Sequence, residues 1–274
     1  MTGVDPARAR GFDAWAGDYD RYRPPYPEEL FEAIAQRLPI PRQPHVVDLG
    51  AGTGRASLAM AELGWRVTAV EPGKPMLDVL RGRAANQGLL VSSVQATAEE
   101  TGLDHASADL VTAAQAFHWF DKDRVLGEAA RILKPSGGIA LFWNVRDAER
   151  SPFLADYAEL LRGLTPDSDA GRYESGLAQA TGIPDETRRA IEAHAASFGA
   201  PQLTQLRHEV TMTGDDFIGM AFTASYVRVG KSPEEQDRFR LDLAALLGRH
   251  GLNDGRQFSV PYRLDLWTAQ RKDR

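Results

Sequence analysis

Apolar positions in the first half of the chain fall into short runs separated by segments with helical spacing. The runs are typical of buried strands and cover residues 45–49, 66–70, 89–95, 108–113 and 139–145. Between them, apolar residues three or four positions apart predict helices over residues 28–38, 55–63, 74–82 and 121–133. This alternation predicts a parallel sheet with helices on both faces.

The pattern changes after Asp147. Residues 151–199 have helical character, whereas 206–213 and 257–269 alternate as strands do, and the last of these can close the sheet. We therefore expect an α/β fold with a Rossmann-like, mostly parallel, seven-stranded sheet and a helical cap inserted after the fifth strand. The predicted division is an N-terminal lid (1–27), a core (28–147 and 201–274) and the cap (148–200), all in one compact unit.

Composition narrows the possible functions. The 274 residues have a net charge of −6 and no basic stripe, which disfavours a nucleic-acid partner. The chain has no cysteine, so disulfides and thiolate chemistry are excluded. No apolar run reaches membrane-spanning length and the N-terminus has no apolar signal core, so we expect a cytoplasmic protein. No histidine pair has metal-ligand spacing, and we predict no metal.

The most informative motif is Gly50-Ala-Gly-Thr-Gly54, which follows the first predicted strand. Glycines allow positive φ and close approach of a ligand, and the next helix directs free N–H groups toward the same space. A dinucleotide fingerprint would need a third glycine at position 55, which is Arg55. Asp48 would be an awkward neighbour for a pyrophosphate, whereas a sulfonium and an ammonium would suit it.

Glu71 follows the second predicted strand, at the spacing of an acidic residue that accepts both ribose hydroxyls. A glycine loop alone is equally consistent with a tight strand-to-helix turn. Together with Glu71, the loop favours ligand binding.

Several motifs occur in order from about Phe12 to Val145. They are Phe12-Asp-Ala-Trp-Ala-Gly-Asp-Tyr-Asp20, Arg23-Pro-Pro-Tyr-Pro27, Val47-Asp-Leu-Gly-Ala-Gly-Thr-Gly54, Val70-Glu-Pro72, Ala96-Thr-Ala-Glu99, Ala114-Gln-Ala-Phe-His-Trp-Phe-Asp121 and Arg131-Ile-Leu-Lys-Pro-Ser-Gly-Gly138. With these motifs the chain resembles the class I methyltransferases that use S-adenosylmethionine. It looks closest to the branch that contains trans-aconitate methyltransferase and similar small-molecule enzymes.

The resemblance implies S-adenosyl-L-methionine as cofactor and S-adenosyl-L-homocysteine as product. It places one group of residues around the methionine end and the ribose: Asp48, Gly50, Gly52, Gly54, Glu71, Gln115 and Ala116. It places a second group beside the adenine: Pro72, Met76, Ala98 and Glu99.

Methyl transfer from a sulfonium needs positioning and exclusion of water, and a base only where the acceptor must lose a proton. His118, after the fourth strand, is the candidate base, although packing between its aromatic neighbours is the commoner role. Trp119 and Trp143 are candidate walls of the acceptor pocket, with core packing as the alternative. Asn144 and Arg146 lie nearby, where a solvated surface role is the default.

The N-terminal segment carries Tyr19, Tyr22 and Arg23, which can form a lid that excludes water and meets a carboxylate. An ordinary docked helix is the alternative. The resemblance favours the lid.

Four functions fit the sequence to different degrees. We expect methylation of a small molecule, at a carboxylate, hydroxyl, amine or activated carbon. The runner-up is a cofactor-binding protein of the same fold that does not methylate, such as a sensor or scaffold. The missing glycine argues against an NAD oxidoreductase. A protein or nucleic-acid methyltransferase is disfavoured because Gln115-Ala-Phe-His stands where a target-amine motif would follow strand four. The oligomeric state stays open.

Overall fold

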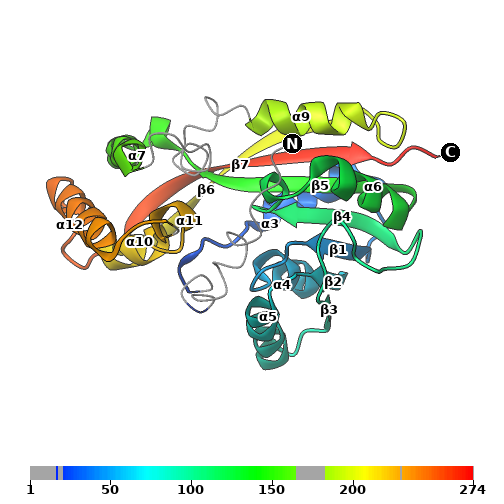
Figure 1. The fold of residues 1–274 in the computed structure, drawn as a ribbon, viewed down its shortest axis with the longest axis horizontal. Coiled ribbons are helices and arrows are strands. Elements are labelled where there is room, and N and C mark those ends of the chain that lie inside the picture. Colours follow the sequence, from blue (N-terminus) through cyan, green and yellow to red (C-terminus); the bar gives the residue numbers. More distant parts are fainter. Residues whose placement is uncertain (1–16, 18–20, 165–182, 229, 274) are drawn as a thin grey trace.

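Seven strands form one sheet at the centre of the molecule (Figure 1). A computed structural model describes residues 17, 21–164, 183–228 and 230–273. The strand order is β3-β2-β1-β4-β5-β7-β6. The bounds are β1 His45–Leu49, β2 Arg66–Val70, β3 Val91–Val94, β4 Ala108–Ala114, β5 Leu133–Arg146, β6 Gln202–Met212 and β7 Phe258–Gln270. The first five strands pair in parallel, and β7 runs antiparallel between β5 and β6. The predicted mostly parallel, seven-stranded sheet is confirmed.

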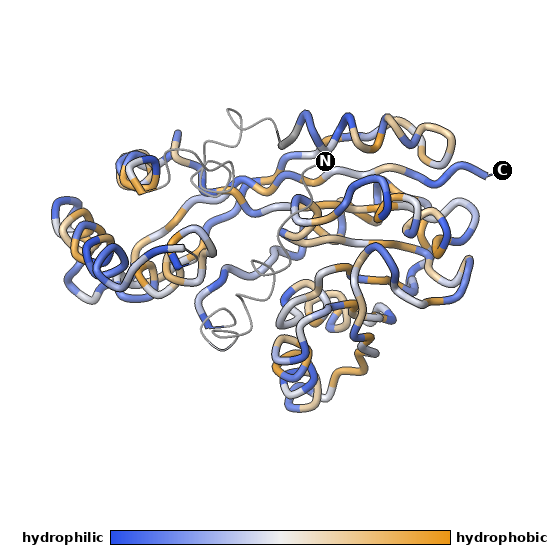
Figure 2. Tube along the Cα trace, viewed as in Figure 1, coloured by the Kyte–Doolittle hydropathy of each residue, from blue (hydrophilic) through white to orange (hydrophobic). Residues whose placement is uncertain are grey.

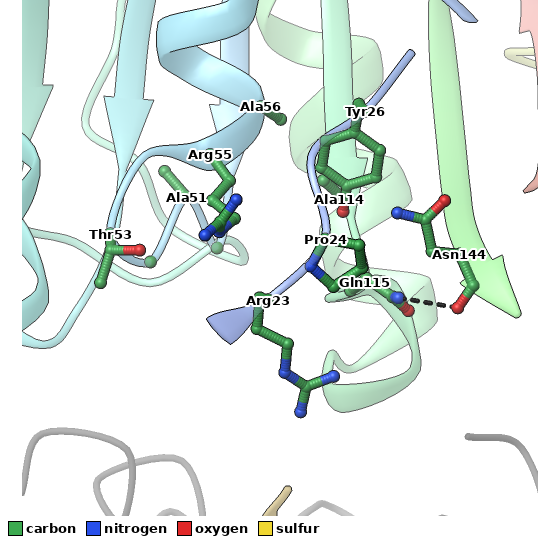
Figure 3. Close-up of a pocket in the computed structure, with 12 residues that line it drawn as sticks. Arg23, Pro24, Tyr26, Ala51, Thr53, Arg55, Ala56, Ala114, Gln115 and Asn144 are labelled. Carbon is green, nitrogen blue, oxygen red and sulfur yellow. Dashed lines mark hydrogen bonds between the residues drawn. The ribbon is translucent and has the colours of Figure 1, made fainter. Parts of the chain in front are cut away.

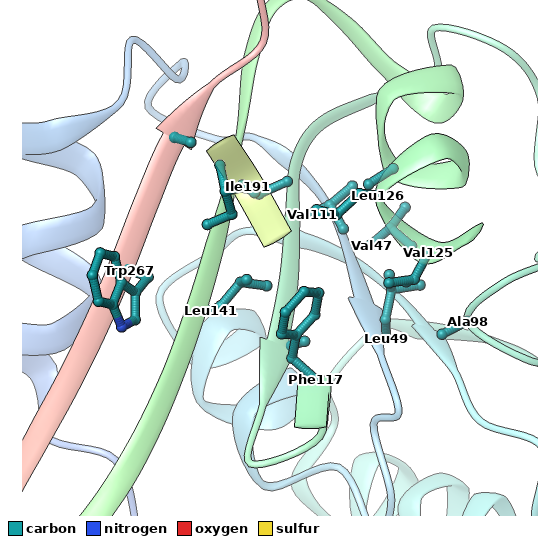
Figure 4. Close-up of a cluster of buried hydrophobic side chains, with 14 of the residues drawn as sticks. Val47, Leu49, Ala98, Val111, Phe117, Val125, Leu126, Leu141, Ile191 and Trp267 are labelled. Atoms are coloured by element: carbon teal, nitrogen blue, oxygen red, sulfur yellow. The ribbon is translucent and has the colours of Figure 1, made fainter. Parts of the chain in front are cut away.

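Helices cover both faces of this sheet. They are α3 Glu28–Arg37, α4 Arg55–Glu62, α5 Lys74–Gln87, α6 Lys122–Ile132, α7 Pro152–Leu164, α9 Ile183–Ala193, α10 Gly214–Ala221, α11 Ser225–Arg228 and α12 Pro233–Arg249, with short 3-10 turns η2 Phe117–Trp119 and η3 Ala148–Arg150. One face packs on α6 and α9, through a core that includes Phe117, Leu126, Ile191 and Trp267 (Figure 4). The opposite face packs on α3 and α4.

A third apolar cluster lies at the far end of β6 and β7. It joins α7, α10, α11 and α12 to Met212, Val260 and Tyr262 of the two strands. The tube of α12 alternates between hydrophobic and hydrophilic residues (Figure 2), as expected for a helix with one buried face. We call this third cluster the helical cluster, and it borders the site described below.

The predicted cap contributes helices to two different layers. Helix α7 packs in the helical cluster, whereas Ile191 of α9 is buried in the core above the sheet. The remainder of the cap, residues 165–182, lies outside the described residues. The division of the chain into lid, core and cap stays a prediction.

Among the strand boundaries that differ from the sequence prediction, two have a local reason. Strand β5 begins at Leu133 rather than Ile139, because Leu133 already pairs with Ala108 before the register shifts at Leu110. Strand β3 begins at Val91 rather than Leu89, since the Leu89 amide donates to Ala84 O in the turn that ends α5.

Candidate functional site

The loop between β1 and α4 forms one wall of a cavity at the carboxyl ends of the strands. The cavity has an empty volume of about 440 Å³, open solvent included. The loop and α4 line it with Gly50, Ala51, Gly52, Thr53, Arg55 and Ala56, and the opposite side consists of Arg23, Pro24, Tyr26, Ala114, Gln115 and Asn144 (Figure 3). In open α/β sheets this edge is where ligands bind.

All three glycines of the loop adopt positive φ, at +65° for Gly50, +56° for Gly52 and +86° for Gly54. A Cβ on Gly50 would lie 2.8 Å from the Ala116 Cβ, and one on Gly54 would lie 2.6 Å from the Leu80 Cγ. These two positions therefore hold the loop against the protein. Around Gly52, no heavy atom of the described residues other than its chain neighbours would meet a Cβ within 4 Å, so this glycine keeps its side of the loop open.

Glu71 lies directly after β2 and binds the glycine loop. Its Oε2 accepts the Gly52 amide at 3.0 Å and its Oε1 accepts the Gly73 amide at 2.9 Å. A carboxylate has about four lone-pair sites, so both oxygens can accept further donors. The arrangement couples the end of β2 to the loop after β1, and it is compatible with the ribose role that the sequence predicts.

Asp48 is buried below the loop, with 1% of its surface exposed. Its Oδ2 accepts the Ser57 hydroxyl at 2.6 Å and its Oδ1 accepts the Thr112 hydroxyl at 2.8 Å. Burial raises the pKa of Asp48 to about 6, although both hydroxyl hydrogen bonds act in the opposite direction. Asp48 is not among the described residues that line the cavity, so its predicted effect on a cationic ligand would act through the loop.

The predicted adenine residues follow β2 and β3, beyond the described lining of the cavity. Met76 and Ala98 are buried, at 4% and 3% exposure. The Pro72 carbonyl accepts from the Gln95 side chain, and Glu99 Oε1 accepts the Asp121 amide at 3.0 Å. Their predicted contacts with adenine stay predictions.

The N-terminal segment crosses the cavity as a strap, defined here as residues 22–26. Arg23 Nε donates to the Thr223 hydroxyl at 2.9 Å, and Asn144 Nδ2 donates to Pro25 O at 3.3 Å. The Tyr22 ring lies against Gly219 of α10, where a Cβ would come within 2.5 Å of it. The strap is thus attached both to the sheet and to the helical cluster. Tyr19 lies outside the described residues.

A second cavity of about 250 Å³, open solvent included, shares Arg23, Pro24, Gln115 and Asn144 with the first. Its other described lining residues are Arg146, Met220 and Tyr262. Arg146 is only 5% exposed, so the expected solvated role for Arg146 is wrong. Asn144, 7% exposed, is also buried rather than solvated.

Asn144 is oriented by a histidine that the sequence did not single out. His208 Nε2 lies 2.8 Å from Asn144 Oδ1, and because Asn144 Nδ2 donates to Pro25 O, the histidine is the donor in this pair. His208 stacks on Tyr262, and burial lowers its pKa. The contact joins β6 to β5 across β7. The sequence signal for it is limited to the alternating pattern that predicts β6, which does not give the position of that strand in the sheet.

The geometry around His118 does not suit a base. Trp143 Nε1 lies 3.2 Å from His118 Nδ1. An indole N–H only donates, so Nδ1 must accept and the proton of neutral His118 sits on Nε2. The lone pair that a base would use is therefore engaged by Trp143.

The two tryptophans do not line either cavity among the described residues. Trp143 is 1% exposed and packs in the core with Phe117, on the face of β5 opposite Asn144. Trp119 is half-buried beside His118, with ring centroids 5.2 Å apart. Core packing, the alternative reading for Trp143, is the one observed.

In the described part of the chain, no group of three or more histidine, aspartate or glutamate side chains is placed to hold a metal ion. Across those same residues, none of the helices is both long enough and apolar enough to cross a membrane.

A sheet of this order with a glycine loop after its first strand defines a Rossmann-like α/β protein with a ligand site at its strand ends. Residues 47–141 match the family described as methyltransferase domain. This stretch is therefore similar to a methyltransferase domain, and the fold of the chain is the Rossmann-like fold of methyltransferases.

An uncharacterized methyltransferase of Mycobacterium tuberculosis is 43% identical over 150 residues, which cover 55% of this chain and 58% of that relative. The match thus spans less than two thirds of the relative. Among solved structures, a candidate type II methyltransferase of Anaeromyxobacter dehalogenans superposes with a TM-score of 0.60 at 26% identity, covering 91% of this chain and 98% of that one. Phosphoethanolamine N-methyltransferase 2 of Haemonchus contortus, in complex with S-adenosyl-L-methionine, gives a TM-score of 0.55 at 16% identity, covering 97% and 60%.

Proposed function

We propose that this chain binds S-adenosyl-L-methionine at the Gly50–Gly54 loop and transfers its methyl group to a small molecule in the adjoining cavity. The observation that carries the proposal is the loop itself: Gly52 stays open toward the strand ends while Gly50 and Gly54 are packed behind it. The matched methyltransferase domain, residues 47–141, begins at β1 and includes this loop.

The residues present fit this cofactor. The first cavity contacts the loop backbone and Gln115, where the methionine part would lie. Glu71, anchored to the Gly52 amide, would accept the ribose hydroxyls. In support, the Haemonchus structure of the same fold contains S-adenosyl-L-methionine.

When bound against the Gly50–Gly54 loop and Glu71, the cofactor would supply an electrophilic methyl group on a cationic sulfur, with S-adenosyl-L-homocysteine as the product. The chain itself orients the acceptor and excludes water. The strap closes the cavity from one side through Pro24 and Tyr26, and we propose that it belongs to the N-terminal lid.

A small-molecule acceptor is favoured because both cavities are modest: the first lies between the glycine loop, the strand ends and the strap, and the second lies between the strap, the sheet and Met220 of the helical cluster. The finer likeness to the trans-aconitate branch is part of this proposal. No nucleic-acid partner is proposed, in keeping with the net charge of −6.

Calorimetric titration tests the cofactor assignment. S-adenosyl-L-methionine and S-adenosyl-L-homocysteine should both bind with 1:1 stoichiometry, and NAD should not, because Arg55 replaces the third glycine of a dinucleotide loop. Binding of NAD without binding of either sulfur compound would contradict the proposal. Binding without transfer of a labelled methyl group across a broad acceptor panel would favour the non-methylating alternative.

His118→Gln should leave turnover within about threefold of wild type and leave the pH–rate profile unchanged. The glutamine Oε1 can accept the Trp143 indole N–H in place of Nδ1, and no proton transfer through position 118 is expected. The measurement is turnover of an identified acceptor from pH 5 to 9. Loss of one limb of that profile in the variant would restore His118 as the base.

A further inference from the structure

The second cavity is lined by two permanently charged side chains. Two of its seven described lining residues, Arg23 and Arg146, are arginines, and none is an aspartate or glutamate. A guanidinium does not deprotonate in proteins, so this charge persists at every working pH. The strap contributes one arginine and the end of β5 the other.

Arg146 is held from behind by two aromatic rings of the helical cluster. Its Cζ lies 5.3 Å from the Tyr157 ring centroid and 6.0 Å from that of Phe217, and both rings are buried. Attraction to a ring face does not use the N–H donors. A guanidinium has five such donors in a planar fork, so it can bind protein groups and still hold an anion through two parallel hydrogen bonds.

We propose that the second cavity binds an anionic group of the acceptor, a carboxylate or a phosphate, and that this group is an anchor separate from the atom that receives the methyl. The proposal rests on the proposed function. The second cavity contains no described residue of the glycine loop, and it meets the first only at Arg23, Pro24, Gln115 and Asn144. An acceptor whose anionic end lies at Arg146 and Tyr262 would therefore present its other end to the cofactor.

Binding of small anions tests this directly. Propionate, inorganic phosphate and the neutral control propionamide are titrated at low ionic strength, without cofactor, and followed by the NMR signals of arginine Nε–H groups. Wild type should bind propionate or phosphate and bind propionamide at least tenfold more weakly. Arg146→Gln should weaken anion binding at least tenfold. Arg146→Lys keeps the charge but loses the planar fork, so it should bind the anions with intermediate affinity. This variant also tests the proposal if Arg146→Gln does not fold.

Arg240 is a matched control, because its Cζ also lies over an aromatic ring, 4.1 Å from the Phe222 centroid, but it lines neither cavity. Arg240→Gln should bind the anions as wild type does. Equal binding of propionate and propionamide by wild type, or unchanged anion affinity in both Arg146 variants, would overturn the proposal. S-adenosyl-L-homocysteine is titrated in parallel: its failure to bind wild type would refute the proposed function and leave the anion result standing.

Discussion

Gly52→Ala is expected to weaken S-adenosyl-L-methionine binding about a hundredfold without unfolding the protein. Among the described residues, no atom beyond its two chain neighbours lies within 4 Å of an added Cβ at this position, so the methyl group would project into the space proposed for the ligand. A hundredfold loss corresponds to about 2.8 kcal/mol. That is within the cost of roughly 1–3 kcal/mol for forcing an extra carbon into a packed contact.

Gly88→Ala is the matched control for backbone strain. Gly88 has φ +67°, close to the +56° of Gly52, and no atom of the described residues beyond its chain neighbours lies within 4 Å of an added Cβ there. It ends α5, away from the cavity. Each alanine should cost about 1–2 kcal/mol of stability from the left-handed backbone. Calorimetry and urea unfolding of both variants separate the two effects. Equal cofactor affinity in the two variants would show that the ligand does not contact Gly52.

The sequence predicted those parts of the site that depend on local spacing. The glycines at 50, 52 and 54 and the acidic residue at 71 follow adjacent parallel strands, and parallel strands bring their carboxyl ends to one edge. The Gly52–Glu71 hydrogen bond is the direct outcome of that rule. The seven-stranded sheet followed from the same periodicity.

The part of the site proposed for the acceptor depends on contacts between residues that are distant in sequence. The spacing of apolar residues along the chain does not predict such contacts. Arg146 was expected to be solvated, but α7 and α10 bury it with Tyr157 and Phe217. For Trp143 the sequence left a pocket wall and core packing open, and the structure buries it in the core on the other face of β5 from Asn144. One step along a strand reverses the face, so the position after a strand could not be assigned without its register.

Asp48 carries a pH effect next to the glycine loop. Its pKa rises from 3.8 to about 6 because the buried carboxylate loses its solvation. Folding therefore favours the protonated form, and Asp48 contributes stability that is fully present below pH 3.8 and is lost as the pH rises through about 6. The gap between the two pKa values corresponds to about 3 kcal/mol.

Asp48→Asn should accordingly gain about 2–3 kcal/mol of stability relative to wild type between pH 4 and pH 8. Asparagine is nearly isosteric and stays neutral, and the Ser57 and Thr112 hydroxyls can each donate or accept toward it. Urea unfolding at both pH values measures the gain. Cofactor affinity at pH 8 should fall in the same variant, because the carboxylate proposed to favour a cationic ligand is gone. Stability and binding would then change in opposite directions at one position.

Glu128 is the control for this pH dependence. Hydrogen bonds from Arg131 and Thr101 lower its pKa to about 2, so it titrates mainly below pH 4.5 and with the opposite sign. Glu128→Gln should lose stability at pH 8 and should not reproduce the gain of Asp48→Asn. If Asp48→Asn shows the same stability difference from wild type at pH 4 and pH 8, the pKa of Asp48 in the folded protein equals its unfolded value, as it would for a solvated carboxylate. Burial would then not impose a pH-dependent cost at this site.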